Sequence, residues 1–196
     1  DKLDVQVRSI GSAKSLAVLE ETHRRGHLIA NHTHRHPHLH KLTPAKQRAE
    51  IDLTNRIIQR VTGTPTYLFR PPYGALAPAA RSYLRKIGST VVMWNVSSDD
   101  DSKFNVSKVL HTVMGNLERQ GGGIMLMHDT HYWTIESVPP ILQAIRVASC
   151  VNLARGEEPY EVVGLEYFWE PRVGKRPARP VSERRAWLAR RAKLVK

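Results

Sequence analysis

The chain has 196 residues, 41% of them hydrophobic, and a formal net charge of +12 at pH 7, so it is long enough for one domain with a buried core. No run of 18 or more apolar residues is present, which excludes a transmembrane helix, and the single cysteine, Cys150, excludes an internal disulfide. Because Cys150 has apolar neighbours, we expect it to be buried as a small hydrophobic residue.

Apolar periodicity predicts helices that alternate with strands. The helical patterns cover residues 13–25, 44–62, 78–87, 105–119 and 138–154. The strand-like apolar runs cover residues 27–30, 67–70, 90–96, 123–127 and 160–165. Gly26 stands where a glycine commonly ends a helix. This alternation predicts parallel strands joined by helical crossovers.

A histidine cluster follows the first predicted strand. Five of the ten histidines lie within residues 32–40. His32 and His36 are four residues apart, so one helical turn would place both imidazoles on one side, where they suit a divalent metal such as Zn²⁺. A solvated polar loop is the alternative for a histidine cluster considered alone.

Three more polar groups follow predicted strands, at the end where α/β barrels carry their functional loops. Arg70-Pro71-Pro72-Tyr73 follows the second run, three acids at 99–101 follow the third, and His128 follows the fourth. Taken singly, each has a structural alternative: an ion-pair arginine before a stiff proline turn, a solvated acidic loop, and a structural histidine.

The order of these motifs resembles that of the NodB-type polysaccharide deacetylases, carbohydrate esterase family 4. His32-Thr33-His34-Arg35-His36 matches the family's His-Ser/Thr-x-x-His, Arg70-Pro71-Pro72-Tyr73 its Arg-x-Pro-Tyr, and Leu126-Met127-His128 its Leu-x-His. The similarity runs from about residue 4 to residue 169. It implies an α/β fold, a distorted (β/α)7-type barrel over residues 1–171, followed by a basic extension at 172–196.

The resemblance also implies a role for each matching residue. His32 and His36 would bind a divalent metal, with Zn²⁺ expected first and Co²⁺ or Ni²⁺ as alternatives. His128 would protonate the leaving amine and Asp100 would tune it; a histidine suits this work because its ordinary pKa is about 6.5. Arg70 would orient the catalytic base, and the backbone N–H of Tyr73 would help to hold the oxyanion.

The chain departs from the family in two places. The family's Thr-Phe-Asp-Asp motif, which carries the base and the third metal ligand, has no match in the 31 residues before His32. We expect that motif and the first barrel strand to lie upstream; the alternative is a glycan-binding relative that lacks both acids and is inactive. In the fourth motif, Ser97 replaces an Asp and Asp101 a Trp, which leaves open whether Asp99, Asp100 or Asp101 meets His128.

The C-terminal extension is strongly basic. Residues 172–196 hold ten basic residues and one acid, which is +9 of the formal +12. A solvated tail, or a helix packed on the barrel, is the simplest interpretation. The functional alternative is an anionic partner, a cell wall or a membrane surface; nucleic acid is less favoured, because charge alone gives only non-specific attachment.

These observations predict a metal-dependent hydrolase that removes N-acetyl groups from a polysaccharide. Peptidoglycan is the first expected substrate and chitin-type oligomers the second. The family implies an extracytoplasmic protein, in the periplasm, at the cell wall or secreted. The chain opens with charged residues rather than a signal peptide, so it would then be a mature or trimmed form.

Overall fold

The computed structural model describes residues 13–102 and 105–165. The chain divides into two compact units, residues 1–141 and 142–196. The predicted boundary at 171/172 and the basic extension lie outside the described residues, so both stay predictions. None of the described helices is long and apolar enough to cross a membrane.

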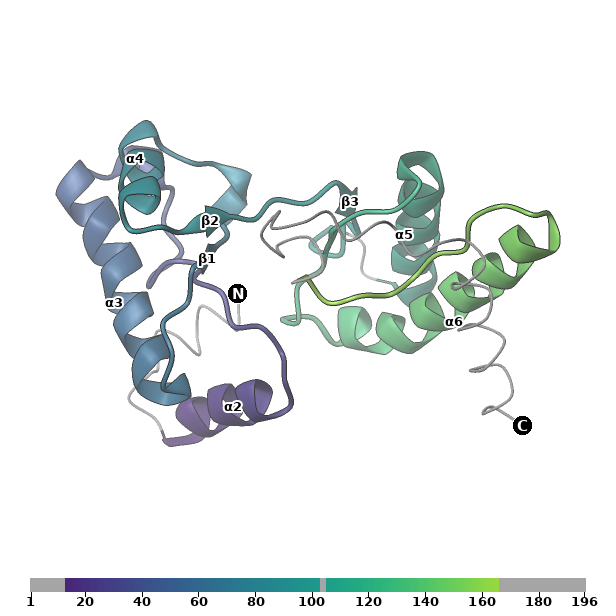
Figure 1. The fold of residues 1–196 in the computed structure, drawn as a ribbon, viewed down its shortest axis with the longest axis horizontal. Helices are drawn as coiled ribbons and strands as arrows, with labels where there is room; N and C mark the ends of the chain where they lie inside the picture. The colour runs from purple at the N-terminus through teal and green to yellow at the C-terminus, as the bar shows by residue number, and fades with distance from the viewer. Residues whose placement is uncertain (1–12, 103–104, 166–196) are drawn as a thin grey trace, which may run out of the picture. The chain divides into compact units, whose positions relative to one another are not determined.

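Five α-helices follow the predicted helical patterns (Figure 1). They are α2 (Ala13–Arg24), α3 (Pro44–Thr62), α4 (Pro78–Lys86), α5 (Val106–Gln120) and α6 (Tyr132–Ala154). Local signals set their ends. The side chains of Thr43 and Asn105 accept hydrogen bonds from the first turns of α3 and α5, and Gly63 and Gly121 end these two helices in the left-handed conformation.

The prediction for α6 was wrong at its beginning. The helix begins at Tyr132 rather than at residue 138, and Pro139 and Pro140 lie inside it. Backbone bonds from Thr134 and Ile135 to the carbonyl of His131 form the first turn. Proline has no backbone N–H, so two prolines inside a helix leave two carbonyls of the preceding turn without a hydrogen-bond donor. Because this destabilises a helix, the sequence favoured a helix that begins near residue 138, just before the prolines.

The strands are short and parallel. β1 (Leu68–Phe69) pairs with β2 (Thr90–Val91), and β3 (Val96–Ser97) pairs with β4 (Met125–Leu126). This confirms the parallel α/β prediction. Within residues 13–102 and 105–165 the strands form two separate two-stranded sheets, so closure into a (β/α)7-type barrel remains a prediction.

Three strand predictions were wrong in extent. The run 90–96 forms β2 and β3, in different sheets, because residues 92–95 lie between two sets of partners. The run 27–30 forms no strand; only Asn31, just after it, makes a bridge, to Phe69. The run 160–165 forms no strand either, and the carbonyl of Tyr160 accepts a hydrogen bond from the side chain of Ser149.

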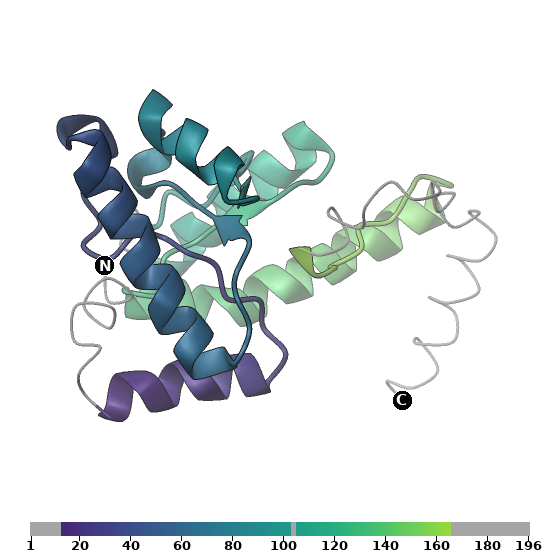
Figure 2. The same cartoon turned by 60° about the vertical axis from the view of Figure 1, so that its left-hand side comes forward.

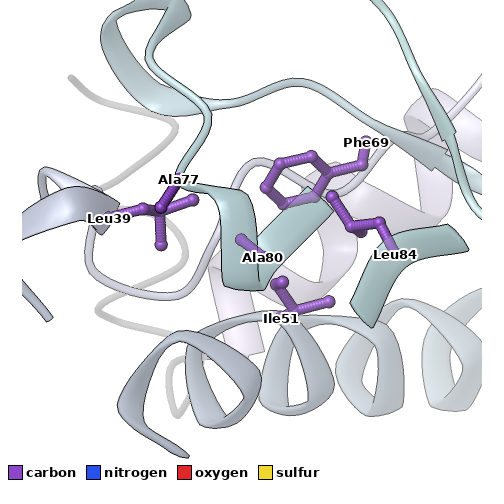
Figure 3. Packing of buried hydrophobic residues seen from close by; sticks show 6 residues of the cluster. All are labelled: Leu39, Ile51, Phe69, Ala77, Ala80 and Leu84. Carbon is purple, nitrogen blue, oxygen red and sulfur yellow. The ribbon is translucent and has the colours of Figure 1, made fainter. Parts of the chain in front are cut away.

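The core around β1 holds the loops that carry the first motifs. Phe69 is fully buried among side chains from α3, α4 and the loop before α3 (Figure 3). The cluster consists of Leu39, Ile51, Phe69, Ala77, Ala80 and Leu84. Burial of each large side chain contributes about 1.5–3 kcal/mol. α2 lies against the C-terminal end of α3 (Figures 1 and 2).

The second sheet is covered by α5. Val109, Val113 and Leu117, four residues apart, are buried on the helix face that packs on β3. β3 and β4 end at the acidic motif and at His128, so this packing supports both. Cys150, on α6, is exposed, so the prediction that it is buried was wrong.

Candidate functional site

The histidine loop is held by a buried asparagine. Asn31 is 1% exposed, and its amide nitrogen donates to the carbonyl of Ile51 at 2.8 Å and to Asn55 Oδ1 at 2.7 Å. Its side-chain oxygen accepts from the backbone N–H of Thr33 at 2.8 Å. The loop is therefore tied to α3 at its first residue. Asn31 was not predicted from the sequence, although this two-residue bond is typical of asparagine at a turn.

His32 and His36 meet, although not on a helical turn as predicted. Their ring centroids are 4.9 Å apart with the planes at 63°. The loop bends through left-handed residues, Thr33 with φ of 68° and His36 with φ of 55°. The side chain of Thr33 accepts from the backbone N–H of His36 at 3.1 Å, and Glu50 accepts from the two N–H groups between them.

The carbonyl of Arg70 sets the tautomer of His32. His32 Nδ1 lies 2.7 Å from the carbonyl oxygen of Arg70, so Nδ1 donates and the Nε2 lone pair is left for another partner. Burial, assisted by the charges of His36 and Arg70, lowers the pKa of His32 to about 4. The ring is therefore neutral at pH 7, the form that binds metal.

The two imidazoles of His32 and His36 could supply part of the ligand set of a metal ion. Imidazole nitrogen suits Zn²⁺, and the two rings are close enough to share one ion. No group of three or more His, Cys, Asp or Glu side chains that could hold a metal occurs within residues 13–102 and 105–165. His32 and His36 are thus two candidate ligands, and a third is not found in that part of the chain.

The Arg-Pro-Pro-Tyr loop lies beside these histidines. The Tyr73 ring stacks on His38 at 3.8 Å and meets His36 edge-on at 4.7 Å, yet remains 57% exposed. The guanidinium of Arg70 is 5.8 Å from the centre of the Trp94 ring, and burial lowers its pKa. Arg70 forms no ion pair within the described ranges, so the base that it was predicted to orient is not seen there.

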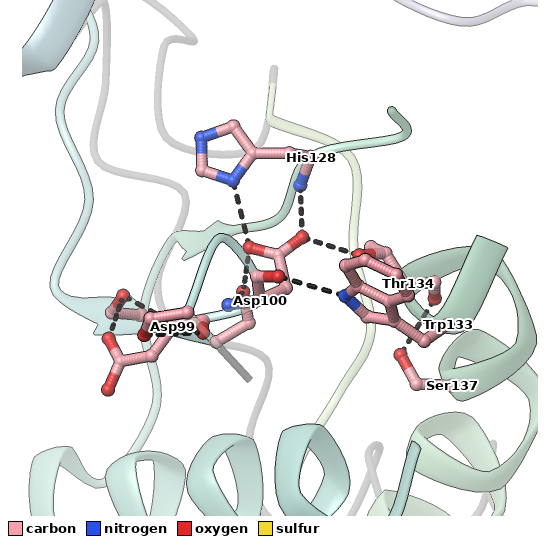
Figure 4. Close-up of polar contacts among 9 residues, drawn as sticks. Asp99, Asp100, His128, Trp133, Thr134 and Ser137 are labelled. Atoms are coloured by element: carbon pink, nitrogen blue, oxygen red, sulfur yellow. Dashed lines mark hydrogen bonds and ion pairs between the residues drawn. The ribbon is translucent and has the colours of Figure 1, made fainter. Parts of the chain in front are cut away.

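The ends of β3 and β4 bring Asp100 and His128 together (Figure 4). His128 Nδ1 lies 2.8 Å from Asp100 Oδ1, and the backbone N–H of His128 donates to Oδ2 at 2.6 Å. Asp100 is 1% exposed, whereas the side chain of His128 is 36% exposed. One edge of the imidazole is therefore fixed on a buried carboxylate, and the ring remains partly open to solvent.

The pair is electrostatically coupled. Burial by itself would raise the pKa of Asp100, but hydrogen bonds from His128, Ser98 and Thr134 outweigh it and hold that pKa well below its usual range. The hydrogen bond to Asp100 in turn raises the pKa of His128, against the opposing effect of burial. The carboxylate is therefore ionised at neutral pH, and His128 holds its second proton more strongly than an ordinary histidine does.

Of the three adjacent acids, Asp100 is the one in contact with His128. Asp99 adopts a left-handed φ of 50° and accepts from the side chain of Ser97 at 2.8 Å, while Asp101 is exposed. Three residues that were not predicted from the sequence also form hydrogen bonds with Asp100: Ser98, Trp133 and Thr134. Ser98 could have been found from its two-residue spacing to Asp100; the other two carry no such signal.

Backbone strain marks the motif loops. Within the described residues, the non-glycine positions with positive φ are Thr33, His36, Tyr73 and Asp99. A left-handed residue with a side chain costs of order 1 kcal/mol or more, and such residues cluster at functional sites. All four lie in the three loops that the motifs identified.

Three histidines of the cluster have no assigned role. His38 and His40 lie 5.4 Å apart, and His34 is half-buried. The buried Nδ1 atoms of His34 and His38 have no hydrogen-bond partner within the part of the chain that the structure describes.

The fold and these loops define an α/β domain with two imidazoles at one strand end and a His–Asp pair at another. Residues 8–92 match the family model for polysaccharide deacetylase. This match confirms the resemblance of the motifs to the NodB-type polysaccharide deacetylases over that part of the chain.

Similar proteins include deacetylases of two polymers. The chain is 32% identical over 148 residues to a chitin deacetylase from Amylomyces rouxii, covering 66% of this chain and 35% of that one. It is 28% identical over 113 residues to a peptidoglycan-N-acetylglucosamine deacetylase from Bacillus cereus, covering 58% of this chain and 40% of that one. The chain thus spans less than half the length of either relative.

Solved structures share the fold. A family 4 carbohydrate esterase from Streptomyces lividans, in complex with acetate, aligns with a TM-score of 0.61 and 28% identity over 77% of this chain and 73% of that one. A CE4 family pseudoenzyme from Bacillus anthracis aligns with a TM-score of 0.63 and 21% identity over 74% of this chain and 48% of that one. Enzymes and a pseudoenzyme therefore have the same fold as this chain.

Proposed function

We propose that this protein hydrolyses N-acetyl groups on a polysaccharide with the help of a divalent metal. The observation that carries the proposal is the buried Asp100–His128 pair, which holds one imidazole edge and raises the pKa of His128. Peptidoglycan is the proposed substrate and chitin-type oligomers the second choice, because the relatives act on these polymers.

His128 is the proposed general acid. Asp100 accepts the Nδ1 proton, so Nε2 carries the second proton of the imidazolium toward substrate. In the proposed step the Nε2–H bond breaks, the leaving amine nitrogen gains the proton, and neutral His128 keeps its Nδ1 proton. The raised pKa of His128 increases the imidazolium fraction near neutral pH, as this role requires.

His32 and His36 are the proposed metal ligands, with Zn²⁺ first and Co²⁺ or Ni²⁺ as alternatives. A bound metal would polarise the acetyl carbonyl and lower the pKa of a water molecule. Burial keeps His32 neutral, and Arg70 fixes its tautomer through the backbone carbonyl.

The Arg-Pro-Pro-Tyr loop supplies the remaining proposed roles. The backbone N–H of Tyr73 would hold the oxyanion, an interaction worth about 2.7–4 kcal/mol in a transition state. The left-handed φ of Tyr73 fits a backbone group held in one orientation at some cost in strain. Arg70, half-buried behind it, would orient the base.

The test is acetate release from N-acetylglucosamine oligomers and from peptidoglycan, with and without chelator and with Zn²⁺ restored. We expect release that chelator abolishes and Zn²⁺ recovers. His128→Ala should abolish it, whereas His111→Ala, which removes an exposed imidazole on α5, should not. Release that persists in the His128 variant or in chelator would count against the proposal.

The metal ligands have a separate test. Isothermal titration with Zn²⁺ should show weaker binding for His32→Ala than for His40→Ala, which removes an exposed histidine of the same cluster. Equal binding by the two variants would reject His32 as a ligand.

A second candidate function is glycan binding without hydrolysis. Two observations favour it: no three-ligand group occurs in the described residues, and the fold matches that of a CE4 family pseudoenzyme. Retention on peptidoglycan with no acetate release at saturating Zn²⁺ would support this function over the first.

The location and the basic extension complete the proposal. A wall polymer as substrate implies an extracytoplasmic protein, which cell fractionation tests. Residues 172–196 are proposed to attach to an anionic wall or membrane surface. Truncation after residue 173 should weaken retention on such surfaces at low salt, and unchanged retention would reject this role.

A further inference from the structure

The Asp100 carboxylate accepts four hydrogen bonds, two at each oxygen. Oδ1 accepts from His128 Nδ1 at 2.8 Å and from the Ser98 hydroxyl at 2.7 Å. Oδ2 accepts from the His128 backbone N–H at 2.6 Å and from the Thr134 hydroxyl at 2.7 Å. Because Asp100 is buried, water has little access to replace a donor that is lost.

Two of the groups that hold Asp100 come from the first turn of α6 (Figure 4). Besides the Thr134 hydroxyl on Oδ2, Trp133 Nε1 donates to the backbone carbonyl of Asp100 at 2.9 Å. Thr134 is itself fixed, since it is 2% exposed and its backbone N–H donates to the carbonyl of His131 at 3.1 Å. The first turn of α6 thus donates hydrogen bonds to both the side chain and the main chain of Asp100.

We propose that Thr134 and Trp133 are positioning residues, which hold Asp100 in the orientation that keeps a proton on His128 Nδ1. The inference rests on the proposed role of His128 as general acid. After donating its Nε2 proton, His128 must remain as the Nδ1–H tautomer, so that Nε2 can take up the next proton. A carboxylate free to turn about its Cβ–Cγ bond would no longer enforce that tautomer.

Thr134 has a specific part in this orientation. Without its hydroxyl, Oδ2 would retain one donor, the His128 backbone N–H, while Oδ1 would retain two. The carboxylate would then be less restrained on the side away from the imidazole. Ser137, one turn further along α6, is equally buried but bonds to the helix backbone and not to Asp100, so it provides a matched control.

The experiment measures the His128 tautomer by ¹⁵N NMR on the full chain with labelled histidine, above the pKa of His128. His128→Gln identifies the signal by its loss. We expect the Nδ1–H tautomer in the unaltered protein, in Thr134→Ser and in Ser137→Ala, and a mixture with the Nε2–H tautomer in Thr134→Val. We also expect kcat for acetate release to fall roughly tenfold in Thr134→Val with KM unchanged, because residues behind a functional group commonly have effects of this size.

A Thr134→Val protein that keeps the Nδ1–H tautomer would overturn the proposal. Should that variant not fold, Trp133→Phe removes the other α6 donor, and an unchanged tautomer there would overturn it equally. The NMR measurement needs no activity. A tautomer shift in a protein that releases no acetate would therefore support the positioning role while rejecting the proposed function.

Discussion

Replacing Asp100 by asparagine tests whether the four hydrogen bonds hold an ionised carboxylate. The backbone N–H of His128 can only donate, so the amide oxygen of the asparagine must stay at the Oδ2 position. The amide NH₂ then takes the Oδ1 position and faces His128 Nδ1, which must become an acceptor. The neutral imidazole would carry its proton on Nε2, the reverse of the proposed state.

The magnitude follows from the same contacts. Each bond to the carboxylate loses its charge assistance, about 1 kcal/mol, so the four set an upper limit of about 4 kcal/mol. Burying a neutral amide costs less than burying a carboxylate, and we therefore expect the free energy of unfolding to fall by about 2 kcal/mol. Acetate release should fall as well.

Urea denaturation at pH 7, followed by circular dichroism, measures this difference. Asp101→Asn makes the same chemical change at the neighbouring, exposed position and should leave the free energy of unfolding nearly unchanged. If the two variants were equally stable, the four bonds would not be holding an ionised carboxylate, and the reasoning about the pair would be refuted.

Three further predictions concern pH, the Tyr73 loop and the core. The pKa of Asp100 is lower in the folded than in the unfolded protein, so the ionised carboxylate stabilises the fold above about pH 4, and this contribution is lost as the pH falls toward the folded-state pKa. The difference in free energy of unfolding between the unaltered protein and Asp100→Asn should therefore shrink over that range. A constant difference in urea midpoints would contradict this. Gly74→Ala should cost more than Gly88→Ala in thermal denaturation, since both have positive φ and cost about 1–2 kcal/mol, but only at Gly74 would the new Cβ lie 3.0 Å from the Trp94 ring; equal costs would show that this contact relaxes freely. Phe69→Ala should lower the free energy of unfolding by about 3–5 kcal/mol, because the side chain is fully buried, and a loss below about 1 kcal/mol would mean that the cluster is not a packed core.

The helices could be predicted because their signals are local. The cap at Thr43, the cap at Asn105 and the glycines after α3 and α5 lie within a few residues of the ends that they set. The strands could not be predicted as well. The apolar run 90–96 looks continuous in sequence, but its two ends pair with residues near 68 and near 125, and such distant partners leave no trace in periodicity.

In the site, too, local patterns could be predicted from the sequence, whereas contacts between distant residues could not. Spacing identified His32 and His36 as residues that meet, and the family resemblance selected Asp100 among three acids as the partner of His128. Spacing predicted the wrong backbone for the histidine loop, since that conformation depends on bonds to Glu50 and to other residues of α3. The hydroxyl of Thr134 was missed for a similar reason: it is 34 residues from Asp100 in the chain.

The left-handed residues in the motif loops have a consequence for how sequences of this protein could drift. At Thr33, His36, Tyr73 and Asp99, glycine or asparagine would fit the backbone at lower energy than the residues present. A laboratory selection for heat resistance alone should therefore enrich those two residues at all four positions. A selection that also demands activity should retain His36. Comparing the two enriched pools would show which of the four side chains are kept for activity rather than for stability.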